Sequence, residues 1–96
     1  MNIPESVKIG YKDYKVDEQE HLNDDTRLLD GQIDYGENKI HLFQRLTDAD
    51  KKATLLHEII HGIDRFMIIG LSEEQVEKLG EGLAMVIRDN ESALFC

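Results

Sequence analysis

Residues 55–64 read LLHEIIHGID, and this stretch decides how the rest of the chain is interpreted. It contains an HExxH motif made of His57, Glu58 and His61. On a helix, residues four apart lie on the same face, so the two imidazoles can share one metal ion. Glu58 projects from the neighbouring face, where it can contact a water bound to that ion. The motif therefore predicts a metal centre with two nitrogen ligands, a nearby carboxylate and a coordination position left for water.

The residues around the motif predict a long helix. Thr47 can cap its first turn, and Asp48 and Asp50 suit the helix dipole there. Gly62 costs about 1 kcal/mol relative to alanine, which predicts a close neighbouring element at that point. The helix should end before Gly70. Apolar residues at steps of three and four predict its buried face, which comprises Ala49, Ala53, Leu56, Ile60, Ile63 and Met67.

A second interpretation of the motif needs no metal. In this interpretation His57 and His61 are partly buried structural residues, and Glu58 lies in a surface ion pair. The positions of the two rings decide between the interpretations, because imidazoles that point into the interior or lie too far apart cannot share an ion.

A second helix is expected to begin after Ser72, which can form a capping box with Gln75. Its predicted buried face comprises Val76, Leu79, Gly80, Leu83 and Ile87. Gly80 and Ala84 are small and would let this helix pack closely on the first. After Arg88 a short tail follows, DNESALFC, in which only Leu94 and Phe95 suggest that the tail packs against the domain.

A catalytic zinc ion usually has a third protein ligand, and the second helix carries four candidate glutamates. With 100° of rotation per residue, Glu73 lies nearest the Gly80 and Ala84 flank, while Glu74 and Glu81 point well away. Glu73 is the predicted ligand, and Glu77, one turn deeper, is the alternative. Either could instead be a solvated helix carboxylate.

Asp64 has two possible roles. It follows His57 by seven residues on the same face, which is too far along the helix axis for both to bind one ion comfortably. It could hydrogen-bond to an imidazole and fix the ring's orientation. It could equally be a surface carboxylate.

The first half of the chain predicts strands. Residues 7–16 read VKIGYKDYKV and predict a hairpin around residues 10–13. Residues 32–35 and 39–43 predict a second hairpin, with Gly36 and Asn38 supplying positive φ in its turn. Between the hairpins, residues 17–25 are acidic and show no period, which predicts a loop or an edge. His21, in that segment, is expected to be solvated.

His41 has two interpretations. Ile40 and Leu42 alternate with it, so one face of this strand should be buried and the other should face solvent or a cleft. His41 is then either an exposed strand histidine or a substrate contact beside the metal.

The bulk composition bounds the class of protein. Residues 1–96 should form a single α+β domain in which a small antiparallel sheet packs on two C-terminal helices. The net charge of −9 without a basic run argues against nucleic acid and favours a basic protein partner. Cys96 is the single cysteine, so no internal disulfide is expected. The sequence shows no signal peptide and no apolar run near the roughly 18 residues of a membrane span, so a cytoplasmic location is expected.

The runs KIHL, TLLHEIIH and SEEQVEKLGEGL resemble the short phage and mobile-element members of the ImmA/IrrE group of zinc metallopeptidases. More broadly they resemble a minimal gluzincin scaffold, over about residues 28 to 90. The resemblance implies that His57 and His61 bind zinc, that Glu58 is the base, and that a glutamate of the second helix is the third ligand. The family's ExxAN stretch matches at Glu73, although Glu77 stands where the family often has asparagine. The chain also lacks the helix-turn-helix domain that some relatives carry.

The resulting hypothesis is zinc-dependent hydrolysis of a peptide bond in an intracellular protein, such as a transcriptional repressor. In this hypothesis the strand over residues 39–43 would hold the substrate by edge pairing. The competing hypothesis is a peptidase-shaped binding module that holds a host or phage protein without cutting it.

Overall fold

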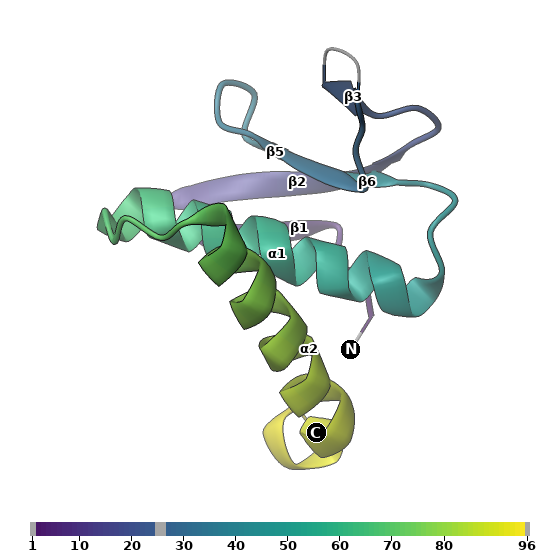
Figure 1. Cartoon of the computed structure of the whole chain (residues 1–96), viewed down its shortest axis with the longest axis vertical. Helices are drawn as coiled ribbons and strands as arrows, with labels where there is room; N and C mark the ends of the chain where they lie inside the picture. The colour runs from purple at the N-terminus through teal and green to yellow at the C-terminus, as the bar shows by residue number, and fades with distance from the viewer. Residues whose placement is uncertain (1, 25–26, 96) are drawn as a thin grey trace.

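The computed structural model describes residues 2–24 and 27–95 and has an α+β fold, as predicted. The described elements are β1 (Ser6–Ile9), β2 (Lys12–Gln19), β3 (Asn23–Asp24), β4 (Arg27–Leu28), β5 (Gly31–Asp34), β6 (Lys39–Phe43), α1 (Asp48–Met67) and α2 (Glu73–Phe95). Figure 1 shows α1 lying beneath the main sheet and α2 running away from it. None of the described helices combines the length and the apolar character that a membrane crossing requires.

The main sheet has the strand order β1-β2-β6-β5. Its two outer pairs, β1 with β2 and β5 with β6, are the antiparallel hairpins that the sequence predicts. The central pair, β2 with β6, is parallel. The sheet is therefore mixed, whereas the sequence predicted an antiparallel sheet. β3 and β4 pair as a separate two-stranded antiparallel sheet.

The prediction of a loop or edge over residues 17–25, of which residue 25 lies outside the described part, was wrong in two places. Residues 17–19 continue β2 in the middle of the sheet, opposite residues 41–43 of β6, and residues 23–24 form β3. The physical reason is that β6 supplies backbone partners along this acidic segment. Two of its carboxylates are also paired: Asp17 with His41 and Glu18 with Lys51, at 2.6 Å in each case.

The β5–β6 turn follows the predicted chemistry in part. Asn38 has φ 56° in the β5–β6 turn, whereas Gly36 is not among the residues with positive φ. Asp34 Oδ1 accepts hydrogen bonds from the backbone N–H groups of Gly36 and Glu37, both at 2.9 Å. This turn therefore rests on the asparagine and on the aspartate side chain.

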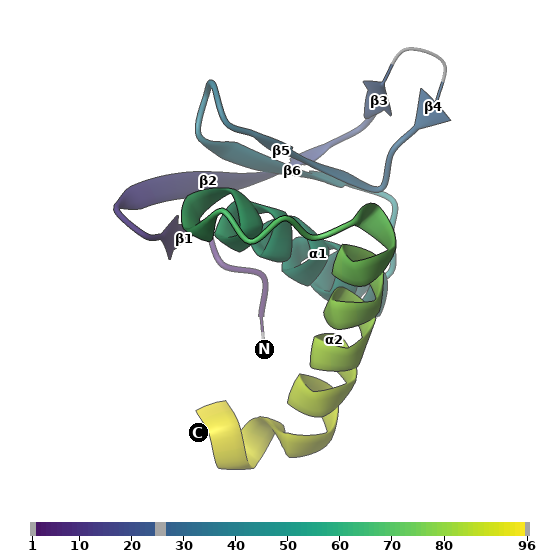
Figure 2. The same cartoon turned by 60° about the vertical axis from the view of Figure 1, so that its left-hand side comes forward.

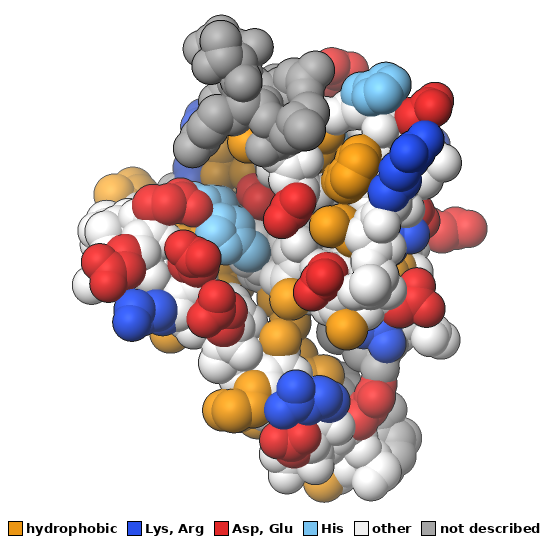
Figure 3. All heavy atoms as spheres, turned by 45° about the vertical axis from the view of Figure 1, so that its right-hand side comes forward, with side chains coloured by type: hydrophobic (Ala, Val, Ile, Leu, Met, Phe, Trp, Pro, Cys, Tyr) orange, Lys and Arg blue, Asp and Glu red, His pale blue; other side chains and the backbone are white. Residues whose placement is uncertain are grey.

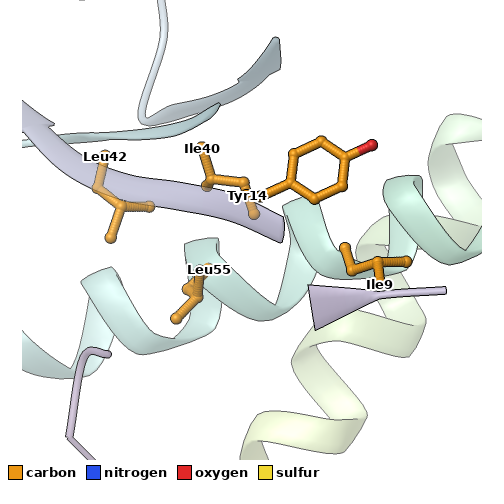
Figure 4. Close-up of a cluster of buried hydrophobic side chains, with 5 residues drawn as sticks. All are labelled: Ile9, Tyr14, Ile40, Leu42 and Leu55. Atoms are coloured by element: carbon orange, nitrogen blue, oxygen red, sulfur yellow. The ribbon is translucent and has the colours of Figure 1, made fainter. Parts of the chain in front are cut away.

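The core lies between the sheet and α1. Figure 4 shows its central side chains, which are Ile9, Tyr14, Ile40, Leu42 and Leu55. Full burial of one such aliphatic side chain contributes roughly 1.5–3 kcal/mol. Gly62 permits the approach of β1, because a Cβ there would lie 2.6 Å from Ile9 Cδ1. The predicted close neighbour of Gly62 is thus confirmed.

Helix α1 begins and ends where the sequence predicts. The Thr47 side chain accepts the Asp50 N–H at 3.1 Å, and the helix ends at Met67. Its predicted buried face was only partly right, because Leu56 and Ile60 are buried but Ile63 and Met67 are exposed. The error arises because α1 has neighbours on two sides, with Leu55 buried in the core beneath the sheet and Leu56 beside α2.

Helix α2 begins with the predicted capping box: Ser72 N–H donates to Gln75 Oε1 at 2.9 Å and Gln75 N–H to Ser72 Oγ at 3.1 Å. The expected end near Arg88 was wrong. The helix bends at Asn90 (φ −131°, ψ 23°), whose side-chain amide donates to the Val86 carbonyl, and then continues. The expectation that the tail packs through Leu94 and Phe95 concerns side chains outside the described part. Cys96 also lies outside it.

Only part of the predicted buried face of α2 is covered. Val76, Gly80 and Ile87 are buried, but Leu79 and Leu83 are exposed. Among the described residues α2 packs on α1 and on no strand. Figure 2 shows its C-terminal half projecting beyond the rest of the domain. A helix with one neighbour buries a narrower face than a helix in a core.

Candidate metal centre

The two histidines of the HExxH motif lie side by side on α1. Their ring centroids are 4.9 Å apart, and the rings are inclined by 68°. The side chains of His57 and His61 are 23% and 27% exposed. The imidazoles therefore face a cleft and do not point into the interior.

Glu73, in the first turn of α2, lies across from both imidazoles. Its Oε1 is 2.9 Å from His57 Nε2, and its Oε2 is 3.0 Å from His61 Nε2. The ligand atoms offered by the three residues all lie within 4.8 Å of one another. Atoms bound tetrahedrally to one zinc ion are about 3.4 Å apart, so a small outward shift of the carboxylate makes room for the ion. The group can hold a metal ion.

The loop between the helices is organised by Asp64. Its Oδ1 accepts the backbone N–H groups of Gly70 and Leu71 at 2.8 and 3.0 Å. Its backbone carbonyl accepts the N–H groups of Ile68, which has φ 55°, and of Ile69. Asp64 is thus a half-buried carboxylate that holds the end of α1, and among the described residues its side chain bonds to backbone N–H groups and not to an imidazole.

Gly80 sets how closely α2 crosses α1, as the sequence predicts. A Cβ at residue 80 would lie 3.3 Å from His57 Cα and 3.5 Å from His57 Cβ. Gly80 itself is buried. This contact fixes the first turns of α2 at the level of the histidines, which is where Glu73 needs to be.

Glu58 is 7% exposed and lies against β5. A Cβ at Gly31 would lie 3.3 Å from Glu58 Oε2, and the Ile33 backbone donates a hydrogen bond to the carboxylate. Burial raises the pKa of Glu58 to about 7 and the charge of Glu73 adds to the rise, while His57 and the Ile33 hydrogen bond oppose it. The interpretation that placed Glu58 in a surface ion pair is wrong.

His57, His61 and Glu73 are called the metal group below. This group opens into a cleft of about 740 Å³ between β5, α1 and α2. Figure 3 shows histidine side chains, in pale blue, in a hollow bordered by red acidic side chains. The cleft is lined by Leu29, Asp30, Gly31, Gln32, Ile33, Tyr35, Ala53, Thr54, His57, Glu58, His61, Glu73, Glu77 and Glu81.

The remaining glutamates of α2 divide differently from the prediction. Glu77 lines the cleft but does not belong to the three-residue group, and Glu74 does not line the cleft. Glu81 also lines it, although the sequence placed this side chain well away. The reason is that each step of four residues rotates by only about 40°, so Glu73, Glu77 and Glu81 stay on one side of the helix.

His41 fits neither of its two interpretations. Its side chain is 14% exposed, and its Nδ1 lies 2.6 Å from Asp17 Oδ1. Because Ile40 and Leu42 point into the core beside α1, His41 lies on the opposite face of the sheet, away from the metal group. His21 is exposed, as predicted.

Asp17 titrates below its ordinary range. Burial would raise its pKa, but hydrogen bonds from His41 and Gln19 outweigh this effect, and the charges of His41 and Lys39 act in the same direction. The net result is a lowered pKa.

The strand that borders the cleft is β5 and not β6. Since β6 lies between β2 and β5, both of its edges are already paired. The expectation that residues 39–43 hold a substrate by edge pairing is therefore wrong. β5 is the edge strand, and sequence reasoning missed its role because the hairpin pattern does not reveal which strand lies inside the sheet.

No protein-family model, curated protein or solved structure matches the chain. The fold and the site together define an α+β domain in which His57, His61 and Glu73 can hold a metal ion.

Proposed function

We propose that the chain is a zinc-dependent metallopeptidase of the HExxH type, similar to the short ImmA/IrrE members, that cleaves an intracellular protein. The observation that supports this most directly is the convergence of His57, His61 and Glu73 beside a buried Glu58. A metal-free packing role does not require two imidazoles and a carboxylate from another helix to meet at one point.

The donor set fits zinc. Two imidazole nitrogens and one carboxylate form a common catalytic zinc site, which keeps a fourth position for water or substrate. The bound ion would polarise the scissile carbonyl and lower the pKa of that water. The three residues come from two helices, so their approach depends on the packing of α2 on α1.

Glu58 is the proposed general base. It takes a proton from the attacking water as the new C–O bond forms, and it passes that proton to the leaving amine as the C–N bond breaks. Its carboxylate is held by the Ile33 N–H on the β5 side of the metal group, adjacent to the strand that would carry the substrate.

β5 is the proposed substrate-binding strand. Phe43 N–H donates to the Asp30 carbonyl at 2.8 Å, so residues 30 and 32 exchange hydrogen bonds with β6. The backbone groups of Gly31 and Ile33 then point to the open edge. The Ile33 N–H is engaged by Glu58, which leaves its carbonyl and both groups of Gly31 for an extended peptide.

Metal analysis beside a cleavage assay tests the proposal. We expect about one zinc per chain in wild type and in Glu58→Gln, and much less in His57→Ala. Peptide cleavage should disappear with a chelator, and in Glu58→Gln it should fall at least 10²-fold, because the general base is lost. Retained cleavage in Glu58→Gln contradicts the mechanism. A metal-loaded wild type that binds peptides without cutting them would instead favour the binding module.

A further inference from the structure

The cleft beside the metal group is one-sided in charge. Its lining includes five carboxylates and no lysine or arginine. Two of the carboxylates are engaged: Glu73 by the imidazoles and Glu58 by the Ile33 backbone. Asp30, Glu77 and Glu81 remain. A bound divalent cation balances two negative charges, so the cleft keeps an excess of negative charge when it is loaded.

Glu77 and Glu81 form the acidic wall of the cleft on α2. They follow Glu73 at steps of four residues, so like charges succeed one another along one side of the helix. Like charges four residues apart on a helix destabilise it. The side-chain carboxylates of Glu77 and Glu81 have no ion-pair or hydrogen-bond partner within residues 2–24 and 27–95. These two carboxylates are therefore open to a ligand in the cleft.

Three basic side chains of the domain are engaged with other residues. Lys51 pairs with Glu18 and Lys39 with Glu37, while the Arg65 guanidinium lies 4.1 Å from the centroid of the Tyr35 ring. The acidic wall faces β5, whose free edge has unpaired backbone groups for an extended peptide. In an extended peptide alternate side chains point to the same side, so every second one can face α2.

We infer that the substrate is a basic peptide segment whose lysine or arginine enters the cleft between β5 and α2 and pairs with Glu77 and Glu81. This inference rests on the proposed function, since it assigns the substrate of the same cleft. The cleft and the adjoining metal group determine where the peptide binds, and the acidic wall determines that its side chain at this position is basic. Glu77 and Glu81 are then specificity-determining residues and take no part in the chemistry.

The test compares two synthetic peptides of identical extended sequence that differ at one position, lysine against glutamine. Binding is measured to zinc-loaded Glu58→Gln protein, so that turnover does not intervene. We expect the lysine peptide to bind about fivefold to tenfold more tightly at low salt, since each exposed ion pair contributes up to about 1 kcal/mol. The preference should shrink as salt rises.

The acidic wall is then removed in the same background by Glu77→Gln with Glu81→Gln, which should abolish the preference. The matched control is Glu5→Gln with Glu74→Gln, which changes the net charge equally but lies outside the cleft. Equal affinity for both peptides, no binding of either, or an equal loss in the control would overturn the inference.

The two proposals fail differently. If wild type cuts both peptides at the same rate and binds them equally, the peptidase function is supported and the preference for a basic side chain is contradicted. If the lysine peptide binds preferentially but is never cut by zinc-loaded wild type, the specificity stands and the peptidase falls.

Discussion

Gly80 of α2 lies directly against His57 of α1, and a Cβ at residue 80 would be 3.3 Å from His57 Cα. This contact joins the packing of the helices to the geometry of the site. Glu73 stands two turns before Gly80 on the same helix, so any displacement of α2 at the crossing moves its carboxylate relative to the imidazoles.

Substitutions at two glycines of α2 separate packing from helix propensity. Gly82→Ala should raise the free energy of unfolding by about 0.5–1 kcal/mol, because alanine favours the helix and nothing lies within 4 Å of the new Cβ. Gly80→Val should lower it by roughly 1–3 kcal/mol, because the side chain meets the α1 backbone. Denaturant melts of both variants measure this. Equal effects at the two positions would contradict the close crossing.

Replacing Glu73 should weaken metal binding. We expect Glu73→Gln to lower zinc affinity by more than the roughly 10–100-fold that outer-shell partners of metal sites typically contribute. Glu77→Gln, which alters the same cleft without touching the imidazoles, serves as the control and should bind zinc nearly as wild type does. Competition with a chromogenic chelator gives both affinities. A larger loss in Glu77→Gln would reassign the third ligand.

Metal should stabilise the folded chain, because its proposed ligands come from two helices that separate on unfolding. At a free zinc concentration 100 times its dissociation constant, the gain is about 2.7 kcal/mol. In a domain of this size that corresponds to a rise in Tm of roughly 10–20 °C. Thermal melts with zinc and with excess chelator measure it, and His57→Ala should show almost no difference between the two conditions.

The pair of Asp17 and His41 should make stability depend on pH in acid. The folded pKa of Asp17 is lowered, so its contribution is complete above its unfolded pKa of about 4 and is lost as the pH falls through the lower folded value. Asp17→Asn should therefore cost about 0.5–1.5 kcal/mol near neutral pH and nothing in strong acid. Urea melts across pH 2–7 test this. If the loss of unfolding free energy in Asp17→Asn instead grew toward low pH, the prediction would be contradicted.

Local features of the fold were predictable from sequence. The Thr47 cap, the box of Ser72 with Gln75 and both hairpins depend on residues a few positions apart, and all are present. The parallel pairing of β2 with β6 was not predictable, because residues 17–19 (DEQ) are all polar and carry no alternation. Their partners lie 24 positions further along the chain.

The site shows the same division. The neighbouring imidazoles of His57 and His61 follow from a single helix, and the meeting with Glu73 follows from helical periodicity and the small residue at 80. The role of β5 and the position of Glu81 depend on how the elements cross in space. Periodicity likewise predicts which residues share a helix face but not whether a neighbour covers it, which is why Leu79 and Leu83 were misplaced.

The parallel centre of the sheet has a consequence for folding. Joining β2 to β6 closes a long loop that contains β3, β4 and β5, and loop closure costs entropy before any pairing energy is gained. Helix α1 and the two hairpins need only short-range contacts, so we expect them to form early. The pairing of β2 with β6, which joins the two hairpins, should then limit the folding rate. Because β5 reaches its place at the edge of the sheet only when β6 pairs with β2, the cleft would be the last part of the domain to be assembled.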